Sequence, residues 1–505
     1  MNRSPQKNPD RAGFVERFWL VSLVAFVLLT RLFFLDMGFG RADAWRVGLT
    51  GKLLATTGQY FPSRPPGFPL VEMISALSYG LFHSSPLTWT VTNALTCLAF
   101  CASIVALWAL AKRWGVRSPL MVAGVYAFAP LNWVYSVETI DYPWMTSFLI
   151  FSVLAVESDR GFAPLRSGVW LGLAAASRFF AALQIVPLLV LAWTKRLSAR
   201  QLVILVLSFI LISLVFYSVV FAEKTSLSEY VGWFQELNKE SSRMAAVKGG
   251  TLVQRFLIPA TSLFGPLATI GFLAAGLWGI PAFVKGLRDR DRGVWAPLLI
   301  ALFVMVPYIW HLHPNYWIPA TGFLLIVLAR SVNARVFAVI GTLIILANFP
   351  WWQTNIEGLR IIDPSGRNPA IQAYARNLAP FQNENVFNET RVRQLLFLSA
   401  EELINRDLPP DRIVMVSLRL PVIAFLVPDI REVDLPLADG STINVWASHA
   451  GGPKFRYMLS PNQVRKAVES GYSVAYLPGI ENGYFAEYGV GIDRVEGLEM
   501  LPNSP

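Results

Sequence analysis

The sequence is short of charged side chains, which make up only 15% of its 505 residues. In an average soluble domain, about a quarter of the residues are charged. In their place the chain has 54% hydrophobic residues, including 34 Phe and 17 Trp. This composition excludes an ordinary soluble protein and predicts a mainly α, polytopic membrane protein.

Cysteine and histidine are also scarce, with two and four residues respectively. Cys97 and Cys101 lie one helical turn apart in an apolar run, which indicates neither a disulfide framework nor a metal box. His311 and His313 are spaced by two residues, but no carboxylate is adjacent to them. We therefore predict no metal site, and a divalent metal stays an open alternative.

The net charge of +10 has two possible explanations. In a soluble protein it would suggest a nucleic-acid partner. In a membrane protein, cytoplasmic loops accumulate Lys and Arg. Given the composition, we expect no nucleic-acid partner and contact with membrane lipids instead.

Apolar runs predict about eleven transmembrane helices, since a helix needs about 20 mostly apolar residues to cross the bilayer core. The run 165–193 is too long for one span, and we predict that it forms two short helices meeting at Ser177-Arg178. The other predicted spans are 18–35, 87–111, 118–136, 141–156, 201–222, 256–284, 295–311, 316–330 and 336–350.

Charge placement gives the orientation, because basic residues mark cytoplasmic loops. Lys and Arg gather at 112–117, 160–166, 195–200, 285–292 and 330–335, whereas the loops 137–141 and 312–315 hold none. We predict an integral plasma (bacterial inner) membrane protein with a cytoplasmic N-terminus and an extracytoplasmic C-terminus. If 165–193 were one span, every later loop would invert.

The first outer loop, 36–86, is expected to carry the functional site. Asp43 precedes a run in which Trp45, Leu49 and Leu53 recur every four residues, and Gly58 closes it. This spacing predicts a short amphipathic helix in the membrane interface. A second interfacial helix is predicted over Gly67 to Phe82, and 223–255 forms a second outer loop.

From Trp351 onward the composition becomes that of a soluble protein. Strand-like and helix-like patterns alternate there: DRIVMVS, LPVIAFLV, IREVDL, PNQVRKAVES and YSVAYLP. We therefore predict two domains, a transmembrane domain over 1–350 and an extracytoplasmic soluble α/β domain over 351–505.

An ordered series of motifs runs through the part of the chain from Phe18 to Pro350. The motifs are the acid before an interfacial helix, Tyr60, Ser63-Arg64-Pro65-Pro66-Gly67, Pro69, Ser136…Glu138…Asp141, Gly172-Leu173-Ala174 with Ser177-Arg178, and His311-Leu312-His313-Pro314-Asn315-Tyr316…Pro319-Ala320. Their order resembles the GT-C superfamily of polyprenyl-phosphate-dependent glycosyltransferases, and most of all its bacterial branch of aminoarabinose and protein mannosyl transferases. Asp43 is followed by Ala44, where many relatives have a second acid.

The resemblance implies transfer of a sugar from a polyprenyl phosphate to a hydroxyl of a glycan, lipid or protein, with inversion of the anomeric carbon. Such a reaction needs a carboxylate as general base and fixed cations for the leaving phosphate. The matched base is Asp43. Its alternative role is a helix N-cap.

Other matched residues divide by charge. Asp141, Glu138 and Asp36 are candidates for an acceptor-binding or secondary acidic role, although Asp141 also suits a helix cap and Asp36 a solvated loop position. The candidates for donor phosphate binding are Arg64, Arg178, His313 and Tyr316. Arg178 could instead snorkel to lipid headgroups, and Tyr316 could belong to an aromatic belt.

Two other classes of protein remain possible. A secondary transporter or flippase of lipid-linked sugars usually has ionisable or broken-helix sites near the membrane midplane and repeated halves. Here the segments 87–111, 201–222, 256–284 and 316–328 contain no Asp, Glu, Lys, Arg or His, and no half-repeat is visible. The third possibility is a scaffold that binds partners through the α/β domain.

Overall fold

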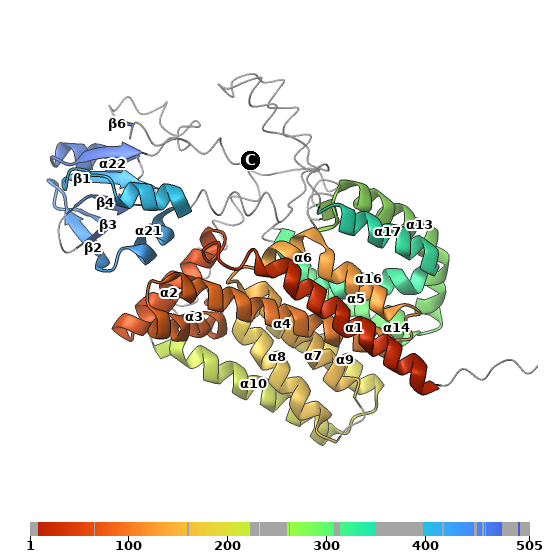
Figure 1. The fold of residues 1–505 in the computed structure, drawn as a ribbon. Helices are drawn as coiled ribbons and strands as arrows, with labels where there is room; N and C mark the ends of the chain where they lie inside the picture. Colours follow the sequence, from red (N-terminus) through yellow and green to blue (C-terminus); the bar gives the residue numbers. More distant parts are fainter. Residues whose placement is uncertain are drawn as a thin grey trace, which may run out of the picture.

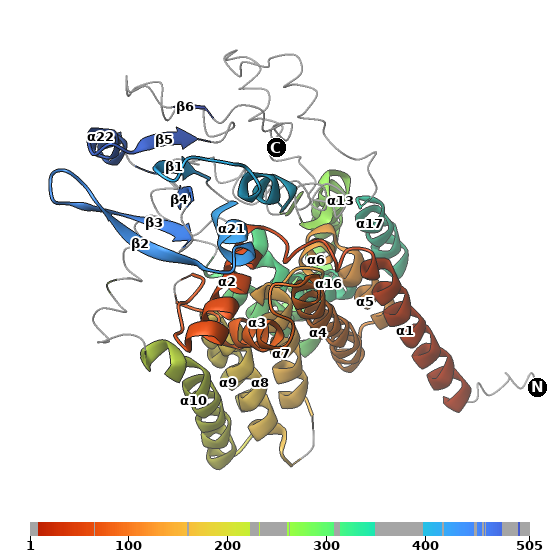
Figure 2. The ribbon, with the colours of Figure 1, turned by 60° about the vertical axis from the view of Figure 1, so that its left-hand side comes forward.

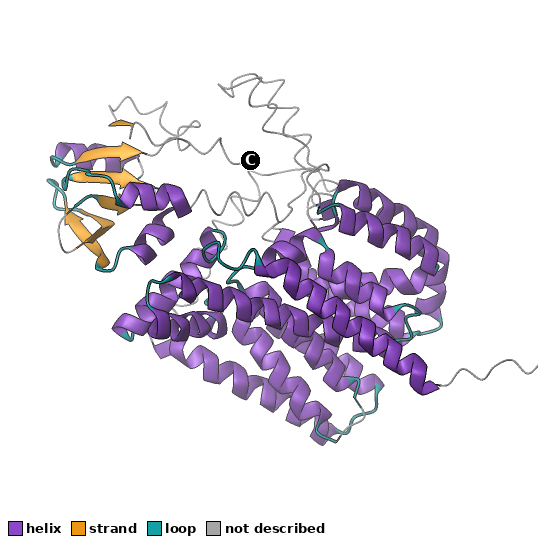
Figure 3. Cartoon of the chain, in the orientation of Figure 1, coloured by secondary structure: helices purple, strands orange, loops and turns teal. Residues whose placement is uncertain are grey.

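The fold is mostly helical, with one small sheet near the C-terminus, as the sequence predicts (Figure 3). It is a computed structural model. The residues that it describes are 9–64, 66–158, 161–222, 232, 260–261, 263–307, 314–348, 397–416, 419–448, 452–456, 459, 461–476 and 493–494.

The N-terminal part of the chain forms a bundle of helices (Figure 1). Its elements are α1 (Pro9–Leu32), α2 (Ala42–Thr57), α3 (Pro69–Phe82), α4 (Pro86–Arg113), α5 (Pro119–Phe128), α6 (Pro130–Tyr135), α7 (Asp141–Val156), α8 (Ala163–Ser177), the 3-10 helix η1 (Phe179–Gln184), α9 (Ile185–Thr194), α10 (Ala199–Ala222), α13 (Pro266–Arg288), α14 (Arg292–Met305), η2 (Pro314–Trp317), α16 (Ile318–Ser331) and α17 (Ala334–Leu346).

Three of the described helices are long and apolar enough to cross a membrane: α4, α10 and the Ala268–Arg288 part of α13. Shorter apolar helices include α7, α14 and α17. Their length and composition place the chain in a membrane. The count of about eleven spans stays a prediction, and the predicted span 118–136 is broken into α5 and α6 at Ala129.

Helices α7 and α8 form a hairpin against which α4 and α10 pack. Helix α8 packs between α7 and α10, and α4 packs against α7. Glycine permits the close approach of α8 to α10, because a Cβ at Gly168 would lie 1.9 Å from Ser208 Oγ, and one at Gly172 would lie 2.6 Å from Ile212 Cβ. The run 165–193 does split, since α8 ends at Ser177 and η1 begins at Phe179.

The C-terminal domain is a six-stranded mixed sheet in the order β2-β3-β4-β1-β5-β6. Strand β1 is parallel to β4 and β5, whereas β2 and β3 form an antiparallel hairpin. The elements are β1 (Arg412–Met415), α21 (Leu420–Leu426), β2 (Ile430–Pro436), β3 (Thr442–Ser448), β4 (Lys454–Arg456), α22 (Pro461–Glu469), β5 (Ser473–Tyr476) and β6 (Asp493–Arg494).

The C-terminal domain contacts the bundle through α21, which packs against α2 (Figures 1 and 2). Phe425 of α21 lies against the rings of Phe39 and Trp45, at centroid distances of 4.9 and 5.6 Å. Lys52 of α2 is buried and donates from Nζ to the carbonyl oxygens that end α21. These acceptors are Ala424 (2.9 Å), Phe425 (3.1 Å) and Val427 (2.6 Å).

The proposed boundary at residue 350 stays a prediction, because residues 349–396 lie outside those that the structure describes. The same holds for the second outer loop, of which only Gly232 is described. The α/β character of the chain after residue 396 agrees with the sequence patterns.

Candidate active site

Asp43 lies in the first turn of α2, with 39% of its side chain exposed. The alternative role as an N-cap does not hold, because Arg41 occupies the cap position and Asp43 is the second helical residue. A carboxylate there is still favoured by the partial positive charge of the helix N-terminus. It also lies 3.4 Å from Arg46 Nη1, one turn further along α2.

Arg64 links two acids from different helices. It donates through Nη1 to Asp43 Oδ2 at 2.7 Å and through Nη2 to Asp141 Oδ1 at 3.2 Å. The loop that carries Arg64 joins α2 to α3, and its guanidinium lies 4.7 Å from the ring centroid of Phe68. Arg64 therefore stands between the half-exposed carboxylate and a deeper one.

Asp141 is the deeper carboxylate, fully buried at the start of α7. Ile140, not Asp141, is the N-cap of α7, so the expected cap role is also wrong. Arg178 donates through Nη1 to Asp141 Oδ2. Its guanidinium lies 4.1 Å from the ring centroid of Tyr142 and 4.6 Å from that of Tyr316.

Asp43, Arg64, Asp141 and Arg178 thus form one continuous ion-pair chain from four separate segments. Arg178 is in an extended conformation at the break between α8 and η1. Each oxygen of Asp141 accepts from a different guanidinium. Charge-assisted pairs of this kind are the stronger hydrogen bonds in proteins.

Both arginines keep an unused donor. The Nε atoms of Arg64 and Arg178 are buried and have no hydrogen-bond partner among the described residues. Unpaired buried donors are costly and call for an explanation, of which an absent ligand is one. An anion with several oxygens, such as a phosphate, would satisfy them.

Glu138 is fully buried beside Arg41, whose Nε lies 3.7 Å from Glu138 Oε1. Arg41 also donates to the Tyr135 hydroxyl at 3.0 Å. Gly40 permits this approach: its φ is +126°, and a Cβ there would meet Glu138 Cγ at 2.7 Å. Glu138 and Asp141, three residues apart, thus pair with different arginines.

Asp36 is placed with a different set of groups. Its Oδ1 accepts from Trp89 Nε1 at 3.2 Å and from Thr90 Oγ1 at 2.9 Å, which ties the start of the loop to α4. Of the remaining candidates for the donor phosphate, Tyr316 lies beside Arg178, and His313 lies outside the described residues.

Glu72 holds the loop that carries Arg64, and the sequence analysis does not single it out. It is fully buried in α3 and accepts hydrogen bonds from Ser63 N (2.7 Å), Phe68 N (3.0 Å) and the Tyr60 hydroxyl. These donors lie on either side of Arg64, so Glu72 fixes the loop that positions the guanidinium. A single acid in an otherwise apolar helix was the available signal.

Arg31, which the sequence analysis also does not single out, supports the turn at Ser136. It is fully buried at the end of α1 and donates from Nε to Ser136 Oγ at 2.9 Å. Its guanidinium lies 4.8 Å from the Trp133 ring centroid and 5.4 Å from that of Phe100. A lone arginine at the end of an apolar run was the signal.

In the described part of the chain, no three His, Cys, Asp or Glu side chains gather as they would around a metal ion.

The chain is similar in fold to several solved structures. One is ArnT from Cupriavidus metallidurans in the apo state, with a TM-score of 0.45 and 16% identity over 82% of this chain and 75% of that chain. The same protein bound to undecaprenyl phosphate gives a TM-score of 0.44 and 15% identity, over 81% and 75%.

A third similar structure is the oligosaccharyltransferase of Archaeoglobus fulgidus with a tethered acceptor peptide. Its TM-score is 0.41, with 11% identity over 82% of this chain and 64% of that one. No protein-family profile matches the chain, and no curated protein does.

Proposed function

We propose that the protein is an integral-membrane inverting glycosyltransferase, which moves a sugar from a polyprenyl phosphate to a hydroxyl acceptor at the outer face of the membrane. The observation that carries this proposal is the ion-pair chain of Asp43, Arg64, Asp141 and Arg178. It combines one half-exposed carboxylate with two guanidinium groups that have unused buried donors.

Asp43 suits the role of general base because, of the two acids in the ion-pair chain, it is the one exposed to solvent. In the proposed reaction its carboxylate takes the proton of the acceptor hydroxyl as the acceptor oxygen bonds to the anomeric carbon. The bond from that carbon to the phosphate oxygen breaks, and its electron pair leaves with the polyprenyl phosphate. A phosphate leaving group needs no proton, so one base is sufficient.

Arg64 and Arg178 suit the leaving phosphate. Negative charge grows on the phosphate oxygens as the bond breaks, so fixed cations stabilise the transition state more than the ground state. A guanidinium offers a planar pair of donors that matches two phosphate oxygens. Because Arg64 touches both Asp43 and the Asp141 pair, base and phosphate site lie side by side.

The proposal is tested by Asp43→Asn, assayed for transfer with a polyprenyl-phosphate-linked sugar after purification in detergent. The substitution keeps the size of the side chain but removes the base, so transfer should fall about 100- to 10,000-fold. Expression and elution volume should not change. Asp434→Asn, an exposed acid on β2, is the matched control and should keep wild-type transfer.

Wild-type turnover by purified Asp43→Asn protein would overturn the assignment of the base. The donor and acceptor are identified by comparing envelope glycans from cells with and without the protein, by mass spectrometry. Loss of one sugar from one glycan supports transfer, whereas accumulation of a cytosolic solute would favour transport.

A further inference from the structure

A pocket lies at one end of the α7–α8 hairpin, and the ion-pair chain lies at the other end. Asp141 begins α7 and Arg178 follows the end of α8, whereas this pocket is lined by the end of α7 and the start of α8. The 16 residues of α7 span about 24 Å at 1.5 Å per residue. The pocket therefore lies close to the opposite membrane surface, since the bilayer core is about 30 Å thick.

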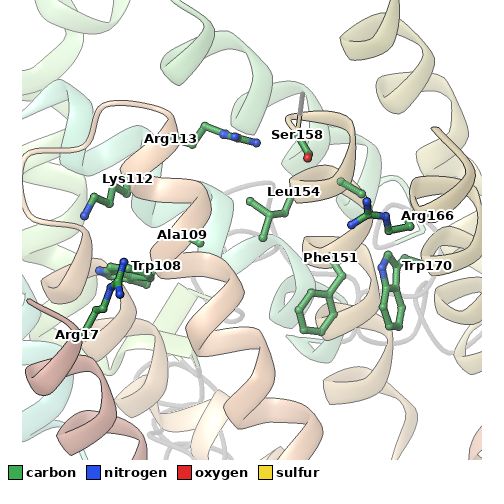
Figure 4. A pocket seen from close by; sticks show the side chains of 11 residues that line it. Arg17, Trp108, Ala109, Lys112, Arg113, Phe151, Leu154, Ser158, Arg166 and Trp170 are labelled. Carbon is green, nitrogen blue, oxygen red and sulfur yellow. The ribbon is translucent and has the colours of Figure 1, made fainter. Parts of the chain in front are cut away.

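The pocket is a cavity of about 600 Å³ between α1, α4, α7 and α8. This volume is within the usual range for small-molecule sites, about 300 to 1,000 Å³. Figure 4 shows its two walls, with Arg113 and Lys112 on α4 and with Arg166 and Trp170 on α8. Phe151 and Leu154 of α7 lie between them.

Four cations line this pocket, and three of them have no described counter-ion. Lys112 pairs with Glu16. No described carboxylate lies within ion-pair distance of Arg17, Arg113 or Arg166, all of which are exposed. Basic residues on this side would follow from the general enrichment of cytoplasmic loops. The general enrichment of basic residues in cytoplasmic loops does not, however, explain why these four cations surround a cavity.

Apart from Ser158, the remaining lining is apolar and aromatic. Trp170 packs against Phe151 with a centroid distance of 5.2 Å, and Trp108 donates from Nε1 to Glu16 Oε1 at 3.1 Å. Tryptophans with one apolar and one polar side are typical of the membrane–water interface. An occupant must therefore have an anionic head for the arginines and an apolar part for these walls.

The geometry points to a binding site for an anionic phospholipid of the membrane leaflet opposite the candidate active site. The phosphate would lie between Arg113 and Arg166, with Arg17 and Lys112 at the rim, and an acyl chain would follow Phe151 and Leu154 toward the lipid. Basic pockets between transmembrane helices bind anionic lipid head groups in this way. The site is separate from the proposed transfer reaction and does not depend on it.

The test uses the full-length protein in detergent, with lipid retention measured by native mass spectrometry. The probes are phosphatidylglycerol, which is anionic, and phosphatidylcholine, which is zwitterionic. Wild-type protein should retain phosphatidylglycerol preferentially. The double variant Arg113→Gln/Arg166→Gln should bind it about tenfold more weakly, equivalent to about 1.4 kcal/mol.

Three variants separate the pocket from general charge and from folding. Arg200→Gln removes an exposed cation at the start of α10 and should bind like the wild type. Arg113→Lys/Arg166→Lys keeps the charge and should retain most binding. Leu154→Trp fills the cavity without changing charge and should weaken binding, which provides a test if the double Gln variant does not fold.

Equal retention of both lipids, or unchanged phosphatidylglycerol binding in the double Gln and Leu154→Trp variants, would overturn the proposal. Displacement of phosphatidylglycerol by millimolar inorganic phosphate would also overturn it, because the occupant would then be a soluble phosphate compound. Asp43→Asn should bind phosphatidylglycerol like the wild type, so a failure of the proposed transfer activity leaves this result readable.

Discussion

Asp141 is the residue that joins the two halves of the candidate site, since each of its carboxylate oxygens accepts from a different arginine. Removing one partner of a buried ion pair typically costs about 3 to 5 kcal/mol, because an uncompensated charge is left inside. A test of the phosphate role of Arg178 should therefore keep the positive charge in place.

We predict that Arg178→Lys binds the lipid-phosphate donor about tenfold or more weakly, while the protein stays folded. Lysine preserves the charge beside Asp141 but loses the planar fork that matches two phosphate oxygens. Donor affinity is measured directly on purified protein. Arg288→Lys, at an exposed position of α13, is the control. Unchanged donor affinity in Arg178→Lys would contradict the phosphate role.

Glu72 makes stability depend on pH in a predictable direction. Burial raises the pKa of its carboxyl above the ordinary value of 4.5, and hydrogen bonds from Ser63, Tyr60 and Phe68 oppose this only in part. The folded protein therefore holds the proton more tightly than the unfolded chain. The stabilisation from this group is complete below about pH 4 and is lost as the pH rises through the folded-state pKa.

The measurement is the difference in melting temperature between wild type and Glu72→Gln across pH 4 to 8. Because glutamine does not titrate, the difference isolates the effect of this carboxyl. The melting temperature of the wild type should fall relative to that of Glu72→Gln as the pH rises. A difference that shifts in favour of the wild type at higher pH would show that the buried group is held as a carboxylate.

Several elements could be predicted from local sequence. The spacing of Trp45, Leu49 and Leu53 with Gly58 predicts α2, and Gly58 does end it in the left-handed conformation, with φ of 72°. The break at Ser177-Arg178 was visible because an arginine interrupts an apolar run. The N-caps were not, because cap geometry depends on backbone angles that several neighbouring residues could adopt equally well.

The contact between α2 and α21 joins the C-terminal domain to the helix that carries Asp43. Burial lowers the pKa of Lys52 to about 8, with a smaller opposing effect from Asp429, so the ammonium form still predominates at neutral pH. Its three N–H groups match the three carbonyl oxygens at the end of α21. This pairing links residues 372 to 375 positions apart, which no local pattern could show.

We predict that Lys52→Met loosens α21. Methionine retains most of the apolar volume but leaves three carbonyl groups without their donor, so amide hydrogen exchange over 420–427 should become about tenfold faster. Lys466→Met, at a half-exposed lysine of α22 that pairs with Asp439, is the control for loss of a lysine within the C-terminal domain. Equal exchange in Lys52→Met and wild type would show that the aromatic contacts alone hold the domain.

At the scale of the whole molecule, the contact between α2 and α21 brings the C-terminal domain next to the helix that carries Asp43, so we expect both on one side of the membrane. The sequence predicts that this side is extracytoplasmic. A reporter that works only outside the cytoplasm should therefore be active when fused after Pro505 and inactive when inserted at Gly115, between α4 and α5. Cytoplasmic labelling of the Pro505 fusion would contradict the predicted odd number of spans.

The candidate site shows where sequence reasoning reaches its limit. Asp43, Arg64, Asp141 and Arg178 were all identified as candidates from motif order. Their pairing was not, because it depends on how four segments separated by up to 135 positions pack together. Glu72 and Arg31 were missed because each acts through neighbours that are distant in the chain or that read as ordinary loop residues.

The position of Asp141 between Arg64 and Arg178 has one more consequence. Two guanidinium groups repel each other, and without a shared counter-ion they would swing apart into solvent or lipid. Asp141 pairs with both guanidinium groups in this structure, so the proposed phosphate would find its two cations already in place. The like charges are then brought together when the chain folds, and not by the incoming anion.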